Sequence, residues 1–145
     1  AQAYALQKVI VDLFPDGGWQ GQVDRLLDLA IDPDKGMKPS PEELSSAIRL
    51  ERELGMTVTR APGGMGEDVI DGLGRSWDFI GSMGDKVPNF DIDQFLVRLS
   101  EKINLEAADR IAVDISQFDT PNAQRVRDFI SELSPIVNSR IVVLE

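Results

Sequence analysis

Acidic side chains stand among apolar ones in the stretch between Gly66 and Gly81. The stretch predicts two short strands around a glycine-rich turn, with Asp68 beside the first strand and Asp78 in the second. Aspartate is a poor strand former, so its presence at both positions indicates that the carboxylates are needed there. Carboxylates on adjacent strands can hold a divalent cation such as Mg²⁺ against a phosphodiester. The structural alternative is a solvent-exposed hairpin with an acidic outer face.

The pairing register of the two strands decides whether these carboxylates form one site. Side chains alternate across a strand and directly paired residues share a face, so Asp68 and Asp78 point into one site only if they are paired. A shift by one residue sends them to opposite faces, and the turn between them does not determine the register. Asp78 lies between Trp77 and Phe79, so its side chain should face away from both.

Other carboxylates of the chain have structural explanations. Ser40 is expected to cap a helix, and Glu43 stands three residues later, where it can close a capping box. Asp71 can flank the turn of the hairpin, where aspartate is common because it hydrogen-bonds the local backbone. Asp114, central in an otherwise apolar strand, could support a site or pair with Arg110.

The composition narrows the possible chemistry. The 145 residues include neither His nor Cys, which excludes histidine-ligated zinc, Ser-His-Asp catalysis and disulfides. A reaction would have to use Asp, Glu, Lys, Arg, Ser, Thr or Tyr. A net charge of −10 disfavours non-specific binding of nucleic acid, which depends on Lys and Arg, and favours solubility or a basic protein partner. A local basic groove would still allow an enzyme that acts on nucleic acid.

The chain shows no signal for the membrane. No run of about eighteen apolar residues exists, so we expect no membrane-spanning helix and no stable membrane insertion. No basic stretch followed by an apolar core and a cleavage site precedes the first helix. The chain does not begin with Met, so we expect it to be part of a longer protein.

Hydrophobic periodicity predicts two regions. Helices over residues 3–14 and 19–31 and a linker over residues 32–39 form an N-terminal helical segment, residues 1–39. From residue 40 to 145 the pattern predicts an α/β domain with a mixed central sheet flanked by helices. Its expected order is a helix ending near residue 54, a strand over residues 56–60, the hairpin, a helix from about residue 89, a strand over 110–115, a helix from 120 and a strand over 141–144.

This order of elements resembles the core of the PD-(D/E)xK nuclease superfamily. More narrowly, residues 40–145 resemble the C-terminal nuclease domain of contact-dependent growth inhibition toxins, which belong to the polymorphic toxins of bacteria. The resemblance rests on the start and the end of the first helix, the hairpin and the following strand, at residues 41–43, 54–55, 68–72, 77–79 and 108–115. Many of these toxins cleave transfer RNA.

The resemblance implies roles for four carboxylate and lysine positions. Asp68 takes the place of the acidic residue in the Pro-Asp motif, Asp78 that of the second acidic residue, and Glu43 that of the helical glutamate. These three would bind Mg²⁺ or another divalent cation. The usual motif lysine would stand at position 80, which is Ile80 here, so Lys102 is the candidate to replace it.

Lys86 is a second candidate for the missing lysine, and Lys102 could instead belong to a solvated helix face. If neither reaches the carboxylates, the fold would be kept while activity is weak or absent.

The resemblance therefore implies a metal-dependent ribonuclease toxin that cleaves tRNA, with Asp78, Asp68, Glu43 and Lys102 as catalytic residues. It would be delivered as part of a larger secreted or cell-surface protein, act in the cytoplasm of a target bacterium, and have a cognate immunity protein as partner. The alternative is a non-catalytic acidic interaction protein, such as an immunity or adaptor partner of a basic toxin. A positive groove would favour the toxin; its candidate cations are Arg60, Arg75, Lys86, Arg98 and Lys102.

Overall fold

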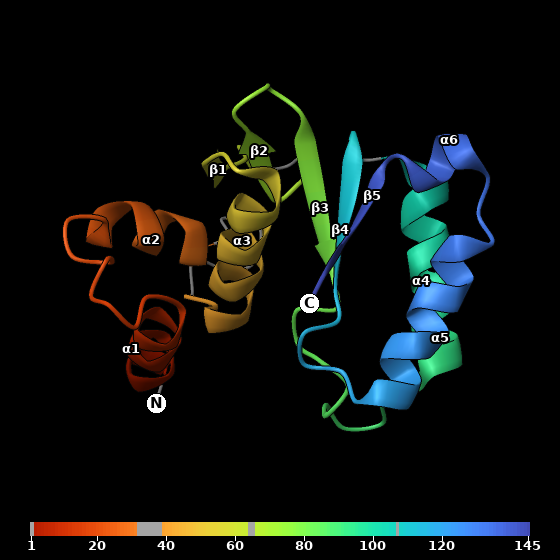
Figure 1. The fold of residues 1–145 in the computed structure, drawn as a ribbon, viewed down its shortest axis with the longest axis horizontal. Helices are drawn as coiled ribbons and strands as arrows, with labels where there is room; N and C mark the ends of the chain where they lie inside the picture. Colours follow the sequence, from red (N-terminus) through yellow and green to blue (C-terminus); the bar gives the residue numbers. More distant parts are fainter. Residues whose placement is uncertain (1, 32–38, 64–65, 107) are drawn as a thin grey trace.

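A five-stranded mixed sheet forms the centre of the computed structural model, which describes residues 2–31, 39–63, 66–106 and 108–145 (Figure 1). Its strands lie in the order of the chain; β1 pairs with β2 and β2 with β3 antiparallel, whereas β3, β4 and β5 are parallel. The predicted α/β class with a mixed, helix-flanked sheet is thus confirmed. The strands are β1 (Val58–Arg60), β2 (Val69–Asp71), β3 (Ser76–Ile80), β4 (Arg110–Asp114) and β5 (Ile141–Leu144).

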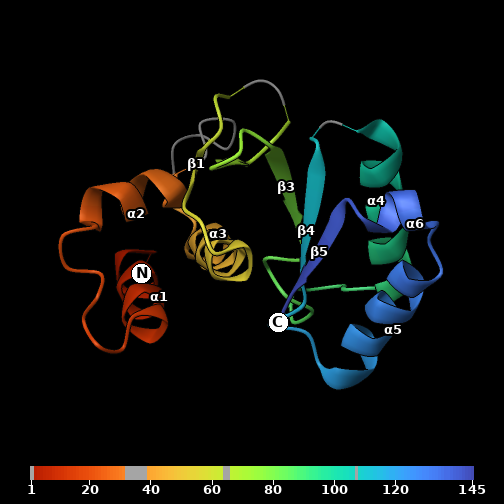
Figure 2. The ribbon, with the colours of Figure 1, turned by 45° about the horizontal axis from the view of Figure 1, so that its top comes forward.

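Helices cover both faces of the sheet (Figures 1 and 2). One face packs against α3 (Pro41–Leu54), and the other against α4 (Ile92–Leu105) and α5 (Thr120–Ser131). Alternation along the strands divides the core in two: in β4, Ala112 belongs to the cluster on the α3 side, while Val113 belongs to the cluster on the α4 side. The short helix α6 (Pro135–Asn138) was not predicted from the sequence.

The N-terminal helices continue the core on the α3 side. Leucines of α1 (Gln2–Leu13) and α2 (Val23–Ala30) are buried in the same cluster as those of α3. The predicted second helix began too early, because residues 19–21 form turns. The predicted linker falls mostly on residues 32–38, outside the described residues, and the two-region division of the chain stays a prediction. None of the described helices is long and apolar enough to cross a membrane.

Capping sets the start of α3 as predicted, but only half of the capping box forms. The Glu43 amide donates to the Ser40 hydroxyl at 3.2 Å, and Gly55 ends the helix in the left-handed region with φ 69°. The Ser40 amide, however, donates to the carbonyl of Ala30 at 2.6 Å. The carboxylate of Glu43 therefore points away from the helix end, which leaves it for other contacts.

Three further expectations are corrected. The helix expected near residue 89 begins at Ile92, because the side chain of Asp91 accepts the amides of the first turn. The first strand begins at Val58, not at residue 56. Asp114 does not pair with Arg110: it accepts hydrogen bonds from the hydroxyl of Ser46 and from Ser116.

Candidate active site

The hairpin brings the two candidate carboxylates together at one end of its paired strands. Val69 pairs with Trp77 and Ile70 with Ser76. Asp68 directly precedes the paired residues; its amide donates to the carbonyl of Trp77 at 2.8 Å, and its carboxyl is hydrogen-bonded with that of Asp78. Both side chains are buried, with 8% and 7% of their residue surface exposed. The alternative of a solvent-exposed acidic face therefore does not hold for Asp68 and Asp78, and the two carboxylates share one site.

The turn of the hairpin, centred on Asp71, holds this register. Its carboxylate accepts the amides of Leu73 and Arg75, the Arg75 guanidinium at 2.8 Å and the Trp77 indole at 2.8 Å. Burial alone would raise the pKa of Asp71, but these donors lower it to about 2. Asp71 thus has the structural role expected of a turn residue, and it does so by joining the turn to β3.

Asp68 lies in surroundings that disfavour its charge. Burial is the largest cause that raises its pKa, and a hydrogen bond with the carboxyl of Asp78 and the charges of Asp78 and Glu43 raise it further. The amide of Phe79 donates to Asp68 Oδ2 at 2.7 Å and acts in the opposite direction. The net result is a pKa of about 7, which makes Asp68 a carboxyl poised to exchange a proton or accept a cation near neutral pH.

Lys102 of α4 supplies a cation at this site. Its ammonium donates to Asp78 Oδ2 at 2.8 Å, and 34% of its side chain remains exposed. Lys86, the other candidate, instead contacts Asp85 and Asp119. Lys102 lies 22 residues after Ile80 in the chain, on a helix that packs against the same face of the sheet as Asp78.

Glu43 reaches the site from the other side, through Arg60 of β1. Arg60 Nη2 lies 3.3 Å from Glu43 Oε2, and Nη1 donates to the backbone carbonyl of Asp68 at 3.1 Å. Nη2 also donates to the carbonyl of Leu29 in α2. Sequence reasoning named Arg60 only as part of a positive groove; its position beside Val69 in the sheet follows from the β1–β2 register, which the loop between these strands does not reveal.

The donor set decides which metal the site could hold. Among the described residues, no group of three or more His, Cys, Asp or Glu side chains is gathered closely enough to hold a metal ion. Asp68 and Asp78 provide two adjacent carboxylates, and Mg²⁺ is commonly held by one or two carboxylates while it keeps several waters. These two residues therefore fit Mg²⁺, whereas the predicted ligand role of Glu43 stays a prediction.

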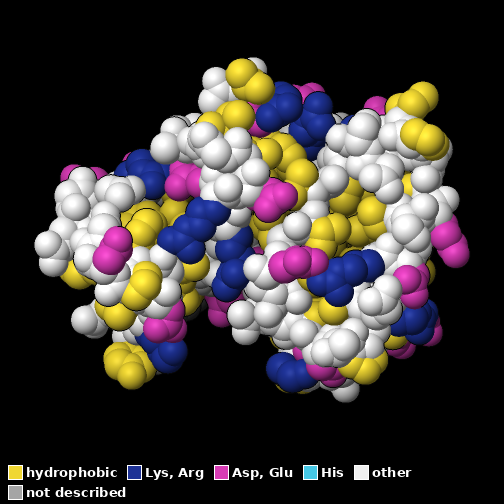
Figure 3. Space-filling view, in the orientation of Figure 1, with side chains coloured by type: hydrophobic (Ala, Val, Ile, Leu, Met, Phe, Trp, Pro, Cys, Tyr) yellow, Lys and Arg dark blue, Asp and Glu magenta, His cyan; other side chains and the backbone are white. Residues whose placement is uncertain are grey.

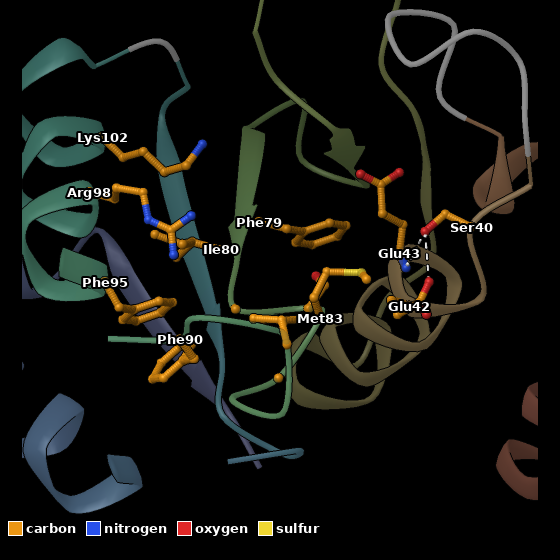
Figure 4. Close-up of a pocket in the computed structure, with 14 residues that line it drawn as sticks. Ser40, Glu42, Glu43, Phe79, Ile80, Met83, Phe90, Phe95, Arg98 and Lys102 are labelled. Carbon is orange, nitrogen blue, oxygen red and sulfur yellow. Dashed lines mark hydrogen bonds between the residues drawn. The ribbon is translucent and has the colours of Figure 1, made fainter. Parts of the chain in front are cut away.

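A cavity of about 470 Å³ is lined by Lys102 and Glu43, whereas Asp68 and Asp78 are not among its lining residues (Figure 4). Arg98 and Lys102 project from α4 on one side, and Glu43 stands on α3 on the other. Phe79 lies between them, and the ring of Phe95 lines the wall below Arg98. The cavity thus combines an apolar aromatic lining with cations at its rim.

Charge is otherwise distributed without a large region of one sign on the face shown in Figure 3, where basic and acidic side chains are interspersed. Of the five cations considered for a positive groove, Arg98 and Lys102 line the cavity, and Arg60 lies beside Glu43. Arg75 pairs with Asp71 in the turn, and Lys86 pairs with Asp85. The positive charge near the site is therefore local and comes mainly from α4.

Comparison with known proteins gives one structural relative. No protein-family model matches the chain, and no curated protein sequence matches it. Among solved structures, the chain is similar to the CdiA-CT toxin from Burkholderia pseudomallei E479, determined in complex with its cognate CdiI immunity protein. The TM-score is 0.55 and the identity 26%, over 72% of this chain and 99% of the other. The mixed sheet and its flanking helices are thus similar to a toxin of contact-dependent growth inhibition over nearly the whole length of that toxin.

Proposed function

We propose that this chain is a toxin domain of bacterial competition that cleaves RNA, most specifically tRNA, by metal-dependent phosphodiester hydrolysis. The observation that carries the proposal is the contact of Lys102 with Asp78, next to an Asp68 whose pKa is about 7. Two carboxylates and one lysine are the groups that such a reaction needs, so a chain without His and Cys can perform it. The similarity to a CdiA-CT toxin supports the toxin class; the PD-(D/E)xK type and the tRNA substrate rest on the sequence resemblance.

Each side chain has a distinct task in the proposed reaction. Asp68 and Asp78 hold the divalent cation, which when bound polarises the phosphate and lowers the pKa of a bound water. Lys102 presents its ammonium at the rim of the cavity, where it can stabilise negative charge that develops on a phosphate oxygen. Glu43 forms an ion pair with Arg60 and lines the side of the cavity opposite Lys102.

The proposal includes the setting in which the domain works. It is delivered as part of a larger secreted or surface protein, acts in the cytoplasm of a target bacterium, and is neutralised by a cognate immunity protein. Support comes from the relative, which was solved with its immunity protein. The alternative of a non-catalytic acidic partner rested on the net charge and on the absent lysine. The contact of Lys102 with Asp78 supports the toxin over this alternative.

The test is incubation of the purified protein with total bacterial tRNA, with Mg²⁺ or with chelator. We expect cleavage only with Mg²⁺, and a loss of at least about 100-fold in Asp78→Asn, which removes a charged ligand while preserving shape. Asp128→Asn on the exposed face of α5 is the matched control and should cleave as the unaltered protein does. RNA that stays intact under every condition, in a folded protein, would contradict the proposal.

A further inference from the structure

We propose that the cavity lined by Phe79, Phe90, Arg98 and Lys102 receives one unstacked nucleobase of a single-stranded segment, so that the adjoining phosphate lies against Arg98 and Lys102. This inference rests on the proposed function, because it assigns to that same site the part of the RNA that the site recognises. It adds a base-binding role for the aromatic wall, which the hydrolysis itself does not need.

The lining of the cavity has the chemistry that binds a base. Phe79, Phe90 and Phe95 line it, and Phe90 is only half-buried, so part of its surface is open to a ligand (Figure 4). Bases outside a duplex stack on aromatic side chains and on guanidinium planes. Arg98 lies over the ring of Phe95, 5.7 Å from its centre, and so extends the aromatic wall toward the rim.

The charges at the rim match a nucleic-acid backbone. Arg98 makes no ion pair with any of the described residues, although the whole chain carries a net charge of −10. Its neighbour Lys102, one turn further along α4, is partly exposed. A phosphate at this rim would pair an otherwise unneutralised guanidinium and would lie against Lys102, which contacts Asp78, where cleavage is proposed to occur.

The wall of the cavity is built to stay open. A Cβ on Gly81 would lie 2.3 Å from the backbone oxygen of Asp114, and one on Gly84 would lie 2.8 Å from the side chain of Gln117. Between them, the Ser82 hydroxyl is 2.7 Å from that of Ser46. The loop is thus packed tightly against α3 and the segment after β4, so the cavity exists before the ligand arrives.

The size of the cavity selects among nucleic acids. About 470 Å³ is within the range of pockets that enclose a small organic molecule, the size class to which a single nucleobase belongs. A base inside a duplex cannot enter without leaving its stack, which favours loops and single strands. Single-stranded RNA is therefore the substrate class that fits both the aromatic wall and the cations.

Binding without cleavage tests this role directly. We would titrate the protein, in chelator, with RNA tetranucleotides of each base and with an abasic ribose-phosphate tetramer, and follow fluorescence anisotropy of the labelled oligonucleotide. The unaltered protein should bind at least one tetranucleotide about 10-fold more tightly than the abasic tetramer. Phe90→Leu keeps apolar volume but removes the ring, so this preference should disappear.

Phe118→Leu is the matched control, because Phe118 packs edge-on against Phe90 but does not line the cavity. It should retain the preference for bases, while Arg98→Gln should weaken binding of both the tetranucleotides and the abasic tetramer. Equal binding of abasic and base-containing tetramers, or a preference unchanged in Phe90→Leu, would overturn the inference. A Phe90-dependent preference in a protein that cleaves no RNA would sustain the inference and reject hydrolysis.

Discussion

At the scale of single residues, the raised pKa of Asp68 makes the stability of the fold depend on pH. Its pKa is raised from 3.8 to about 7, so the folded protein holds a proton that the unfolded chain has lost between these pH values. A raised carboxyl pKa stabilises the fold at low pH, and this contribution is lost as the pH rises toward 7. Asp71 acts in the opposite sense and only below about pH 4, because its pKa is lowered.

We therefore predict that Asp68→Asn removes a pH-dependent penalty. Relative to the unaltered protein, the free energy of unfolding of the variant should increase by about 2 kcal/mol between pH 5 and pH 7. Urea denaturation of both proteins at the two pH values measures this difference, in which the contributions of other groups cancel. An equal difference at both pH values would show that Asp68 titrates normally. RNA cleavage should be lost in the variant at either pH.

A second prediction concerns the charge of Lys102. Lys102→Met should reduce single-turnover cleavage of tRNA by about 100-fold, because it removes the cation that meets the developing phosphate charge. Lys102→Arg keeps the charge and should retain most of the activity.

Lys8→Met, on the exposed surface of α1, provides the control for loss of a lysine as such. Far-ultraviolet circular dichroism confirms that each variant is folded. Full activity in Lys102→Met would remove Lys102 from the reaction.

At the scale of elements, the loop after β3 leaves no room for a side chain at Gly81. Gly81 has φ 94°, and a side chain there would meet the backbone of Asp114. We predict that Gly81→Ala lowers the free energy of unfolding by about 3 kcal/mol, through both backbone strain and the close approach.

Gly72→Ala is the matched control for this change. A Cβ at Gly72 makes only ordinary contacts with Met56, so its effect should stay within about 1 kcal/mol. Urea denaturation compares the two variants. If both variants lower the free energy of unfolding by the same amount, the loop can move away from Asp114 at the end of β4.

Elements with strong local signals were predictable from the sequence. Ser40 caps the start of α3 with its side chain, and Gly55 ends the helix in the left-handed conformation. Both signals act within a few residues of the chain. The face of Asp78 also followed, since Trp77 and Phe79 on either side had to be buried. Strand alternation therefore predicted a feature of the site as well as of the fold.

Features that depend on distant partners were not predictable in the same way. The contact of the Asp68 carboxyl with that of Asp78 depended on a hairpin register that the Asp71 network holds. The contact of Lys102 with Asp78 depended on how α4 lies against the sheet, which periodicity does not specify. The contacts of Arg60 were not predicted for the same reason, because its partners come from three separate parts of the chain.

At the scale of the whole molecule, the N-terminal helices and the sheet share one core. Leu26 of α2 is fully buried there, whereas its neighbour Leu27 is 37% exposed. We predict that Leu26→Ala lowers the midpoint of a single thermal transition and costs about 3 kcal/mol, while Leu27→Ala has a smaller effect. Calorimetry distinguishes this from an early, separate transition, which would show that the first two helices unfold independently.

The three contacts of Arg60 determine the stage of folding at which the candidate site is complete. Its guanidinium joins the end of α2 to Glu43 and to the backbone of Asp68. A nascent chain in which α2 is undocked lacks the carbonyl of Leu29, one of the anchors that align this guanidinium. In a toxin domain of the kind proposed, we therefore expect activity only after α2, a helix of eight residues, has docked and completed the contacts of Arg60.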